Sequence, residues 1–419
     1  MLTGPTWSPE LSKYYVSDPF SVTDMLDVLV GLHTNATATD PLSGLTGISG
    51  EKSAIIVHPK VRWQYVPTPP GTPSKVLMTT GSISDKNYTF TKAGAKGAFH
   101  HTNSALVIYK RGDTFWPMLV NADASGSFFH LDKYYTKGVG TKWEGKGYGL
   151  VVGDLHCEVI DGSVLSATWT SETSLVKSLP IMTQVFHDMI DFNIEHSHHN
   201  KNDLIYRHAL KKYNRSSAVQ SINKTCEVLD KIITNSPNTS NFKVVSSNHH
   251  DHIYKFLNET SLKHIHSWED QQLYVNLLSA VFKDSTLGKG GDLRNVNILQ
   301  KVLQFKLLPP IYQKLSFLGR NESFLLYGVD CSQHGDRGPN GSRGGLNTFA
   351  GVSHKTTTGH SHTAGIKDGA MVVGHSSNPN HNYNSGYSSW THSHALHYPN
   401  GKRTLITIID GQWLPGKGL

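Results

Sequence analysis

Four short apolar runs in the last two-thirds of this chain each end near residue types that bind metal ions. They have the length and composition of strands that are buried on both faces. Open α/β sheets place binding sites at the carboxyl ends of such strands. The pattern therefore predicts a mixed fold, α/β or α+β, with a polar site along one sheet edge. The runs are 148–153, 180–186, 241–245 and 323–329, and they lead into Asp154, Asp188, Asn248 and His334.

The composition favours a soluble protein with a polyanionic partner. The chain has 419 residues, enough for two or three domains, and no apolar run approaches the ~20 residues that a membrane span needs. No secretory signal is visible, and three cysteines without a CxxC pair favour a reducing compartment, so a cytoplasmic protein without a membrane partner is expected. The net charge of +7 favours nucleic acid as a partner and fits a mildly basic soluble protein equally well.

The chain divides into two parts of different character. Residues 1–145 are predicted to form a mostly β N-terminal region of unknown role, in which 21–32 is the one candidate for a longer helix. Residues 146–419 hold the metal-binding motifs and are predicted to form the second domain. Apolar side chains at three- and four-residue spacing predict a helical insertion at about 200–310. Its helices are expected at 202–234, 251–258, 268–283 and 293–307.

The residue types that follow these runs suit a pair of divalent cations. Asp154 and His156 stand two positions apart, so they project to the same side of an extended segment. Asp188 offers a carboxylate that can bridge two cations ~3.5–4 Å apart. Asn248 offers a neutral oxygen, and the Gly-His-Ser-His segment that ends at His362 adds two imidazoles. This donor set makes Mn²⁺ the first choice for both ions, ahead of Fe, Zn²⁺ and Mg²⁺.

Two further residues are candidates for roles in catalysis. Asp191 comes three residues after Asp188 and is expected to support a metal ligand by hydrogen bonding. His249 directly follows Asn248. It is therefore placed to protonate a leaving oxygen or to stabilise charge on phosphorus.

The order, types and local spacings of these residues resemble those of the calcineurin-like metallophosphoesterase superfamily. The resemblance implies a β-sandwich flanked by helices, a water between two metals that attacks phosphorus, and His249 as the residue that assists the leaving group. His187 and Ser247 stand where the superfamily usually has glycine, and Phe192-Asn193 stands where Arg-Gly is frequent in phosphatases. The implied ligands are Asp154, His156, Asp188 and His362 for the first metal, and Asp188, Asn248, His334 and His360 for the second.

Two arginines after His334 are candidates for substrate binding. Arg337 and Arg343 lie in a glycine-rich loop, and arginine forms bidentate contacts with phosphate. A solvated loop is an equally good interpretation. Six other histidines are given no chemical role: His196, His198 and His199 are assigned to a polar loop, and His392, His394 and His397 to structural positions.

Phrases outside the site give a closer resemblance, to phage-encoded metallophosphoesterases such as the early host-DNA-degrading proteins of T5-like phages. They include Thr79-Thr-Gly-Ser-Ile83 and the Tyr398-Pro-Asn-Gly-Lys-Arg403 segment near the end. This resemblance implies a Mn²⁺-dependent DNase in the host cytoplasm, with DNA as its substrate and a homo-oligomer as one assembly state. Two alternatives stay open: a nucleotidase or phosphatase acting on small phosphomonoesters, and a non-catalytic nucleic-acid-binding module.

Overall fold

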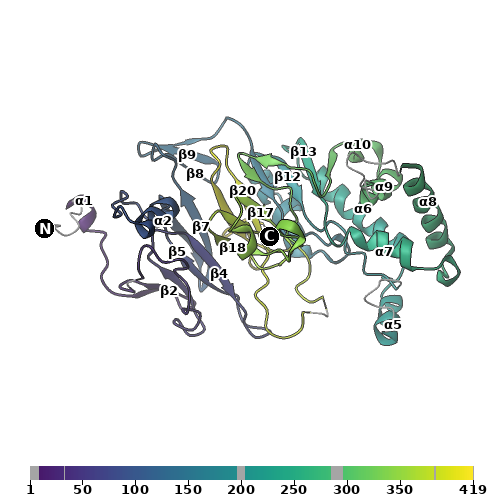
Figure 1. The fold of residues 1–419 in the computed structure, drawn as a ribbon, viewed down its shortest axis with the longest axis horizontal. Coiled ribbons are helices and arrows are strands. Elements are labelled where there is room, and N and C mark those ends of the chain that lie inside the picture. The colour runs from purple at the N-terminus through teal and green to yellow at the C-terminus, as the bar shows by residue number, and fades with distance from the viewer. Residues whose placement is uncertain (1–8, 33, 196–202, 285–295, 382–383, 419) are drawn as a thin grey trace.

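The computed structural model of the protein describes residues 9–32, 34–195, 203–284, 296–381 and 384–418. The three histidines His196, His198 and His199 lie outside these ranges. Along the long axis of the molecule, the N-terminal strands, the central strands and the helices α6 to α9 follow one another (Figure 1). The fold is thus a mixed α/β arrangement, as the apolar runs predicted.

A six-stranded sheet carries the first three predicted strands. The neighbours β11 to β14 are parallel, whereas β20 is antiparallel to β11 and β21 is antiparallel to β20. The parallel strands all present their carboxyl ends at one edge of the sheet. In order across the sheet, the strands are β14 (Leu315–Leu318), β13 (Asn241–Val245), β12 (Ile181–Phe186), β11 (Tyr148–Val151), β20 (Ser393–His397) and β21 (Arg403–Thr407).

A ten-stranded sheet joins strands from both ends of the chain. Its two halves meet where β4 pairs with β18 in antiparallel register, so strands on either side of residue 145 share one sheet. The domain boundary at residue 145 stays a prediction. In order, the strands are β1 (Phe20–Thr23), β2 (Leu26–Leu29), β3 (Ser53–Ile56), β5 (Lys75–Thr79), β4 (Arg62–Val66), β18 (Gly365–Lys367), β19 (Ala370–Val372), β17 (Thr356–Thr358), β16 (Val329–Asp330) and β15 (Leu325–Leu326).

Two smaller sheets lie beside these. The hairpin of β6 (Ser104–Arg111) and β7 (Thr114–Asn121) packs along β21. The indole nitrogen of Trp116 donates to the carbonyl of Gln412, which follows β21 in the chain. A three-stranded sheet follows it in the chain, made of β8 (Phe128–His130), β9 (Lys133–Thr136) and β10 (Val139–Lys142).

The two large sheets face each other across one apolar core. Adjacent residues of β11 point to opposite faces, as the pleat of a strand requires. Val151 packs in the core between the sheets, with Trp63 and Ile366 of the ten-stranded sheet. Leu150 packs on the other face, in the core that the helices share. Burial on both faces explains why these strands read as continuous apolar runs.

The longer helices cover the outer face of the six-stranded sheet. Helix α6 begins after Ser217, whose hydroxyl accepts from the amide of Gln220, and it buries Ile222, Leu229 and Ile233 against the core. The bounds are α5 (Leu204–Lys212), α6 (Ala218–Thr234), α7 (Asp251–Glu259), α8 (Trp268–Asp284) and α9 (Ile298–Lys306). The other α-helices are α1 (Pro9–Ser12), α2 (Lys92–His100), α3 (Gly162–Leu165), α4 (Leu175–Ser178), α10 (Pro309–Tyr312) and α11 (Leu346–Phe349).

Three sequence predictions of single elements were wrong. The segment 21–32 forms strands β1 and β2 instead of a helix, because their pairing with each other and with β3 satisfies the backbone. The helix expected at 202–234 is broken between α5 and α6, where Asn214 has φ of +53°. The run 323–329 forms a hairpin of β15 and β16 in the ten-stranded sheet. The strand that pairs with β13 in the six-stranded sheet is β14 instead.

Within the ranges described above, no helix combines the length and apolar character needed to cross a membrane.

Replacing Trp63 by alanine should destabilise the protein by about 3–5 kcal/mol, because a fully buried indole in the core between the sheets leaves a large cavity. Urea unfolding followed by circular dichroism measures the change. Val57→Ala is the control, since the Val57 side chain is 55% exposed just beyond β3. Equal stabilities of the two variants would contradict this account of the core.

Candidate metal centre

The centre begins where β11 and β12 end. The two strands stay paired beyond their last residues: the amide of Leu155 donates to the carbonyl of His187 at 3.0 Å, and that of His156 donates to the carbonyl of Asp188 at 2.8 Å. This continued pairing brings Asp154 and His156 beside Asp188. The ten-stranded sheet supplies the other side, because β16 leads into His334 and its parallel neighbour β17 leads into His360.

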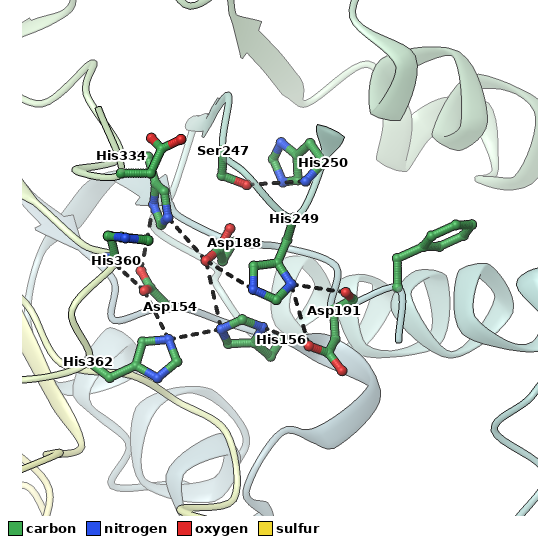
Figure 2. Close-up of polar contacts among 12 residues, drawn as sticks. Asp154, His156, Asp188, Asp191, Ser247, His249, His250, His334, His360 and His362 are labelled. Carbon is green, nitrogen blue, oxygen red and sulfur yellow. Dashed lines mark hydrogen bonds and ion pairs between the residues drawn. The ribbon is translucent and has the colours of Figure 1, made fainter. Parts of the chain in front are cut away.

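Four side chains form the first donor set, and they are those expected for the first metal: Asp154, His156, Asp188 and His362. All four are buried, and one donor atom of each lies within 4.8 Å of the others (Figure 2). His362 Nε2 is 3.0 Å from His156 Nε2 and 3.2 Å from Asp154 Oδ2. Asp188 Oδ2 is 3.8 Å from His156 Nε2. Donors about 2.1 Å from one cation lie roughly 3–4 Å from each other, so the spacing fits an ion.

The second donor set shares Asp188 with the first. Asp188, His334 and His360 also form a group whose donor atoms lie within 4.8 Å of one another, and His334 Nε2 is 3.1 Å from Asp188 Oδ2. Asn248 directly precedes His249, whose Nε2 lies 4.0 Å from Asp188 Oδ2. The Oδ1 atom of Asn248 is buried and has no hydrogen-bond partner. A shared carboxylate between two sets is the arrangement that a pair of cations requires.

Several donor atoms at this centre are buried without a hydrogen bond from the protein. Buried polar atoms are normally satisfied, and each orphan costs about 1–3 kcal/mol. A cluster of orphans on residues of metal-binding type therefore fits a site built for cations. The atoms are Asp154 Oδ1, Asp188 Oδ1, Asn248 Oδ1, His334 Nδ1 and His362 Nδ1.

Backbone strain is concentrated in the same residues. His156, Asp188, His360 and His362 all have positive φ, between +38° and +75°. Such conformations cost of order 1–3 kcal/mol each in residues other than glycine, and they cluster at functional sites. Gly359 is needed for close approach, since a Cβ there would lie 2.1 Å from Asp154 Oδ1. The chain thus gives up local stability to direct these side chains inward.

Asp191 and His249 lie next to the donors, where the sequence placed them. Asp191 Oδ1 is 3.4 Å from His156 Nδ1, so the carboxylate orients the ring whose Nε2 faces the first set. The Nδ1 atom of His249 lies 2.9 Å from the Asp191 carbonyl oxygen, which can only accept, so this nitrogen carries the hydrogen. Nε2 of His249 then faces the centre, 4.0 Å from Asp188 Oδ2. The His249 side chain is 14% exposed, which leaves it within reach of a substrate.

Charges at the centre shift the pKa values of its members. Burial raises the pKa of Asp188, but His334 and His249 outweigh it and hold that pKa well below its usual range. Burial lowers the pKa of His156, but the hydrogen bond to Asp191 and the charge of Asp188 reverse this and raise it to about 9. The metal-free centre therefore holds protons where cations would bind.

The two arginines of the glycine-rich loop lie on exposed backbone. The Arg337 side chain is 59% exposed and forms an ion pair with Asp251 at 3.2 Å. The backbones of Arg337 and Arg343 pair in an isolated antiparallel β-bridge. Arg320 holds the same loop, because its guanidinium contacts both oxygens of Asp336 at 2.7 and 2.8 Å. A role for Arg337 and Arg343 in substrate binding stays a prediction.

Sequence motifs missed four residues that shape the centre. Trp390 packs edge-on against His362 with ring centroids 4.2 Å apart, and His375 stacks on His362. His381 packs against His156, with centroids 5.3 Å apart. Glu158 accepts from the amides of Asp191 and Phe192, which holds the Asp191 loop. The density of histidines at 375–397 was the only signal in the sequence.

The three histidines expected to be structural differ in their contacts. His394 is fully buried and accepts from the amide of Gly153 at 2.9 Å. His397 is fully buried beside Thr357. His392 contacts the carbonyl of Ser377 at 2.9 Å and packs against His375, the ring that stacks on His362.

Binding of Mn²⁺ should release protons at pH 7. A cation needs the lone pair of His156 Nε2, and the pKa of about 9 means that this ring is protonated in the metal-free protein. The apparent affinity for Mn²⁺ should therefore rise with pH, by up to roughly tenfold per unit for each proton released, and level off above about pH 9. Titration calorimetry in buffers of different ionisation enthalpy counts the protons. An affinity independent of pH would contradict the assignment of His156 as a ligand.

Replacing Asp191 by asparagine should weaken Mn²⁺ binding about 10–100-fold, since the neutral amide no longer orients and polarises His156. Equilibrium dialysis with metal analysis gives the affinity, and thermal unfolding checks the fold. Glu144→Gln is the matched control, because Glu144 is an exposed carboxylate in the loop before β11. If the two variants bind Mn²⁺ equally well, Asp191 has no part in the centre.

Comparison with known proteins places the chain in a family. No family model and no solved structure matches it. Protein A1 of Escherichia phage T5 is 30% identical to it over 390 residues, which cover 90% of this chain and 67% of that protein. A match of that extent reaches both sides of the predicted boundary at residue 145. The chain therefore belongs to the same family as Protein A1 of phage T5.

Proposed function

We propose that the protein is a two-metal phosphoesterase and that its substrate is DNA. One observation carries the first part: two donor sets share the carboxylate of Asp188, and the donor atoms within each set lie within 4.8 Å of one another. Structural metal sites are closed by their ligands. Here His249 and His360 are only partly buried, which leaves these two side chains within reach of a substrate.

Each residue of the proposed centre has a separate role. Two divalent cations, with Mn²⁺ favoured, would supply Lewis acidity and a nucleophilic water at neutral pH. Asp154, His156, Asp188 and His362 would hold the first ion, and Asp188, Asn248, His334 and His360 the second. Asp191 keeps the ring of His156 in one orientation. His249, with Nε2 directed at the centre, donates a proton to the leaving oxygen when its ring is protonated.

The charge of the protein supports a polyanionic substrate. The net charge is +7 with neutral histidines. Arg337 extends from the loop that follows His334 and leaves more than half of its side chain exposed, where a phosphate beside the centre would meet it. The resemblance to host-DNA-degrading phage proteins points the same way. A Mn²⁺-dependent DNase that degrades host DNA in the cytoplasm of an infected cell is the function that these features support best.

The purified protein loaded with Mn²⁺ should degrade double- or single-stranded DNA, and Asp188→Asn or His362→Ala should lower the rate at least 10³-fold, because each removes a ligand of the first set. Gel assays of linear and circular DNA measure the activity and distinguish exonuclease from endonuclease action. His208→Ala is the control, since His208 is an exposed imidazole on α5.

The same assay separates the alternatives. Turnover of mononucleotides while DNA stays intact would assign a nucleotidase or phosphatase. Binding of DNA without turnover under Mn²⁺, Fe²⁺, Zn²⁺ or Mg²⁺ would assign a nucleic-acid-binding module. Either result overturns the DNase proposal.

A further inference from the structure

A second cavity lies away from the metal centre, with a volume of about 510 Å³. That volume is in the range of pockets for small molecules. Its walls include the end of α2, the end of β7, the loop that precedes β17, the turn between β18 and β19, and the turn between β20 and β21, with Lys60, Val61 and Lys86 beside them. The N-terminal region and the C-terminal part of the chain therefore build it together.

The cavity and the metal centre lie at opposite ends of β17. Lys355, which lines the cavity, immediately precedes this strand, and His360 follows it. Five residues of extended chain span about 16 Å. The turn at Gly401 and Lys402 is likewise at the far end of β20 from Gly153, whose amide contacts His394. The cavity is thus separate from the donors described above.

The cavity has a surplus of positive charge. Five cationic side chains line it, Lys60, Lys86, Lys355, Lys402 and Arg403, against two carboxylates, Asp123 and Asp368. With neutral histidines, five minus two leaves a formal charge of +3.

Both carboxylates are already engaged. Asp368 pairs with Lys60 and His100, and Asp123 accepts from the amides of Ser125 and Ser127. In the described part of the chain, no ion pair joins Lys355 or Lys402 to a carboxylate.

The unpaired ammonium groups repel one another. Burial lowers the pKa of Lys355, and the charges of Lys402 and Arg403 lower it further. Burial also lowers the pKa of Lys402; the charge of Asp123 opposes this, and that of Lys86 adds to it. A phosphate between these groups would relieve the repulsion, as charge-assisted hydrogen bonds to phosphate do in other proteins.

The rest of the lining suits a planar ring. Leu119, Ile366 and Met371 are buried apolar residues of the cavity wall. Phe99, at the end of α2, is 81% exposed. An exposed aromatic ring beside cationic groups offers a stacking surface for a nucleobase, while the lysines meet its phosphates.

We propose that this cavity binds a free nucleotide, a nucleoside mono- or polyphosphate, in a site separate from the metal centre. Lys355, Lys402 and Lys86 contact the phosphates, and Phe99 stacks on the base. A single nucleotide is favoured over a nucleic-acid strand because the volume of the cavity is in the range of small-molecule pockets.

Titration calorimetry on the full chain tests this after the metals are stripped with a chelator and the chelator is dialysed away. The probes are dATP, ADP, dAMP, inorganic phosphate and a single-stranded decanucleotide. We expect dATP to bind without added metal. The double variant Lys355→Gln/Lys402→Gln should weaken that binding at least tenfold. Phe99→Ala should weaken dATP binding and leave the weaker binding of inorganic phosphate unchanged.

Lys133→Gln/Lys142→Gln is the matched control for the loss of two charges, because both lysines are exposed on the β9–β10 hairpin. Thermal unfolding of every variant checks the fold. The proposal is overturned if dATP does not bind, if the control pair weakens binding as much as the pocket pair, if phosphate binds as tightly as dATP, or if only the decanucleotide binds. Since the assay needs neither metal nor turnover, its failure would leave the DNase proposal untouched, and the reverse also holds.

Discussion

The structure has to hold several buried carboxylates and imidazoles together, although some of their polar atoms have no hydrogen-bond partner in the protein. Like charges on Asp154 and Asp188 repel each other at low dielectric, and the neighbouring histidines outweigh this repulsion and lower the pKa of both carboxyl groups. The main chain also accepts positive φ at four donors. Such a group persists only when the surrounding packing is firm, and the two apolar cores on either side of the six-stranded sheet provide that packing.

Two sheets are needed because one cannot bring all donors together. The parallel strands β11, β12 and β13 bring Asp154, Asp188 and Asn248 to one edge. The parallel strands β16 and β17 bring His334 and His360 to the same place from the other sheet. The N-terminal strands extend this second sheet through the pairing of β4 with β18, so the N-terminal region stabilises the strands that carry the histidines. The basic cavity lies at the far end of the same strands.

Predictions from the sequence were most accurate where residue types and neighbours along the chain decide whether a segment forms a strand. The apolar runs before Asp154, Asp188 and Asn248 became strands because burial on both faces requires continuous apolar sequence. The predictions failed at 323–329 and at 21–32, where short segments can form either a strand or a turn and distant partners decide between them. Trp390 and His381 were missed for a similar reason, since ring contacts with His362 and His156 join segments that no local pattern links.

What the sequence alone determined was the kind of chemistry: carboxylates and imidazoles in a fixed order, each after a segment that forms a strand or a tight turn. Only the tertiary structure decided that Asp188 is shared by two donor sets, that Asp191 turns toward His156, and that half of the ten-stranded sheet comes from the first eighty residues. The physical reason is that donor type follows from the covalent chain. Distances of 3–4 Å between residues two hundred positions apart follow from how the sheets pack and pair.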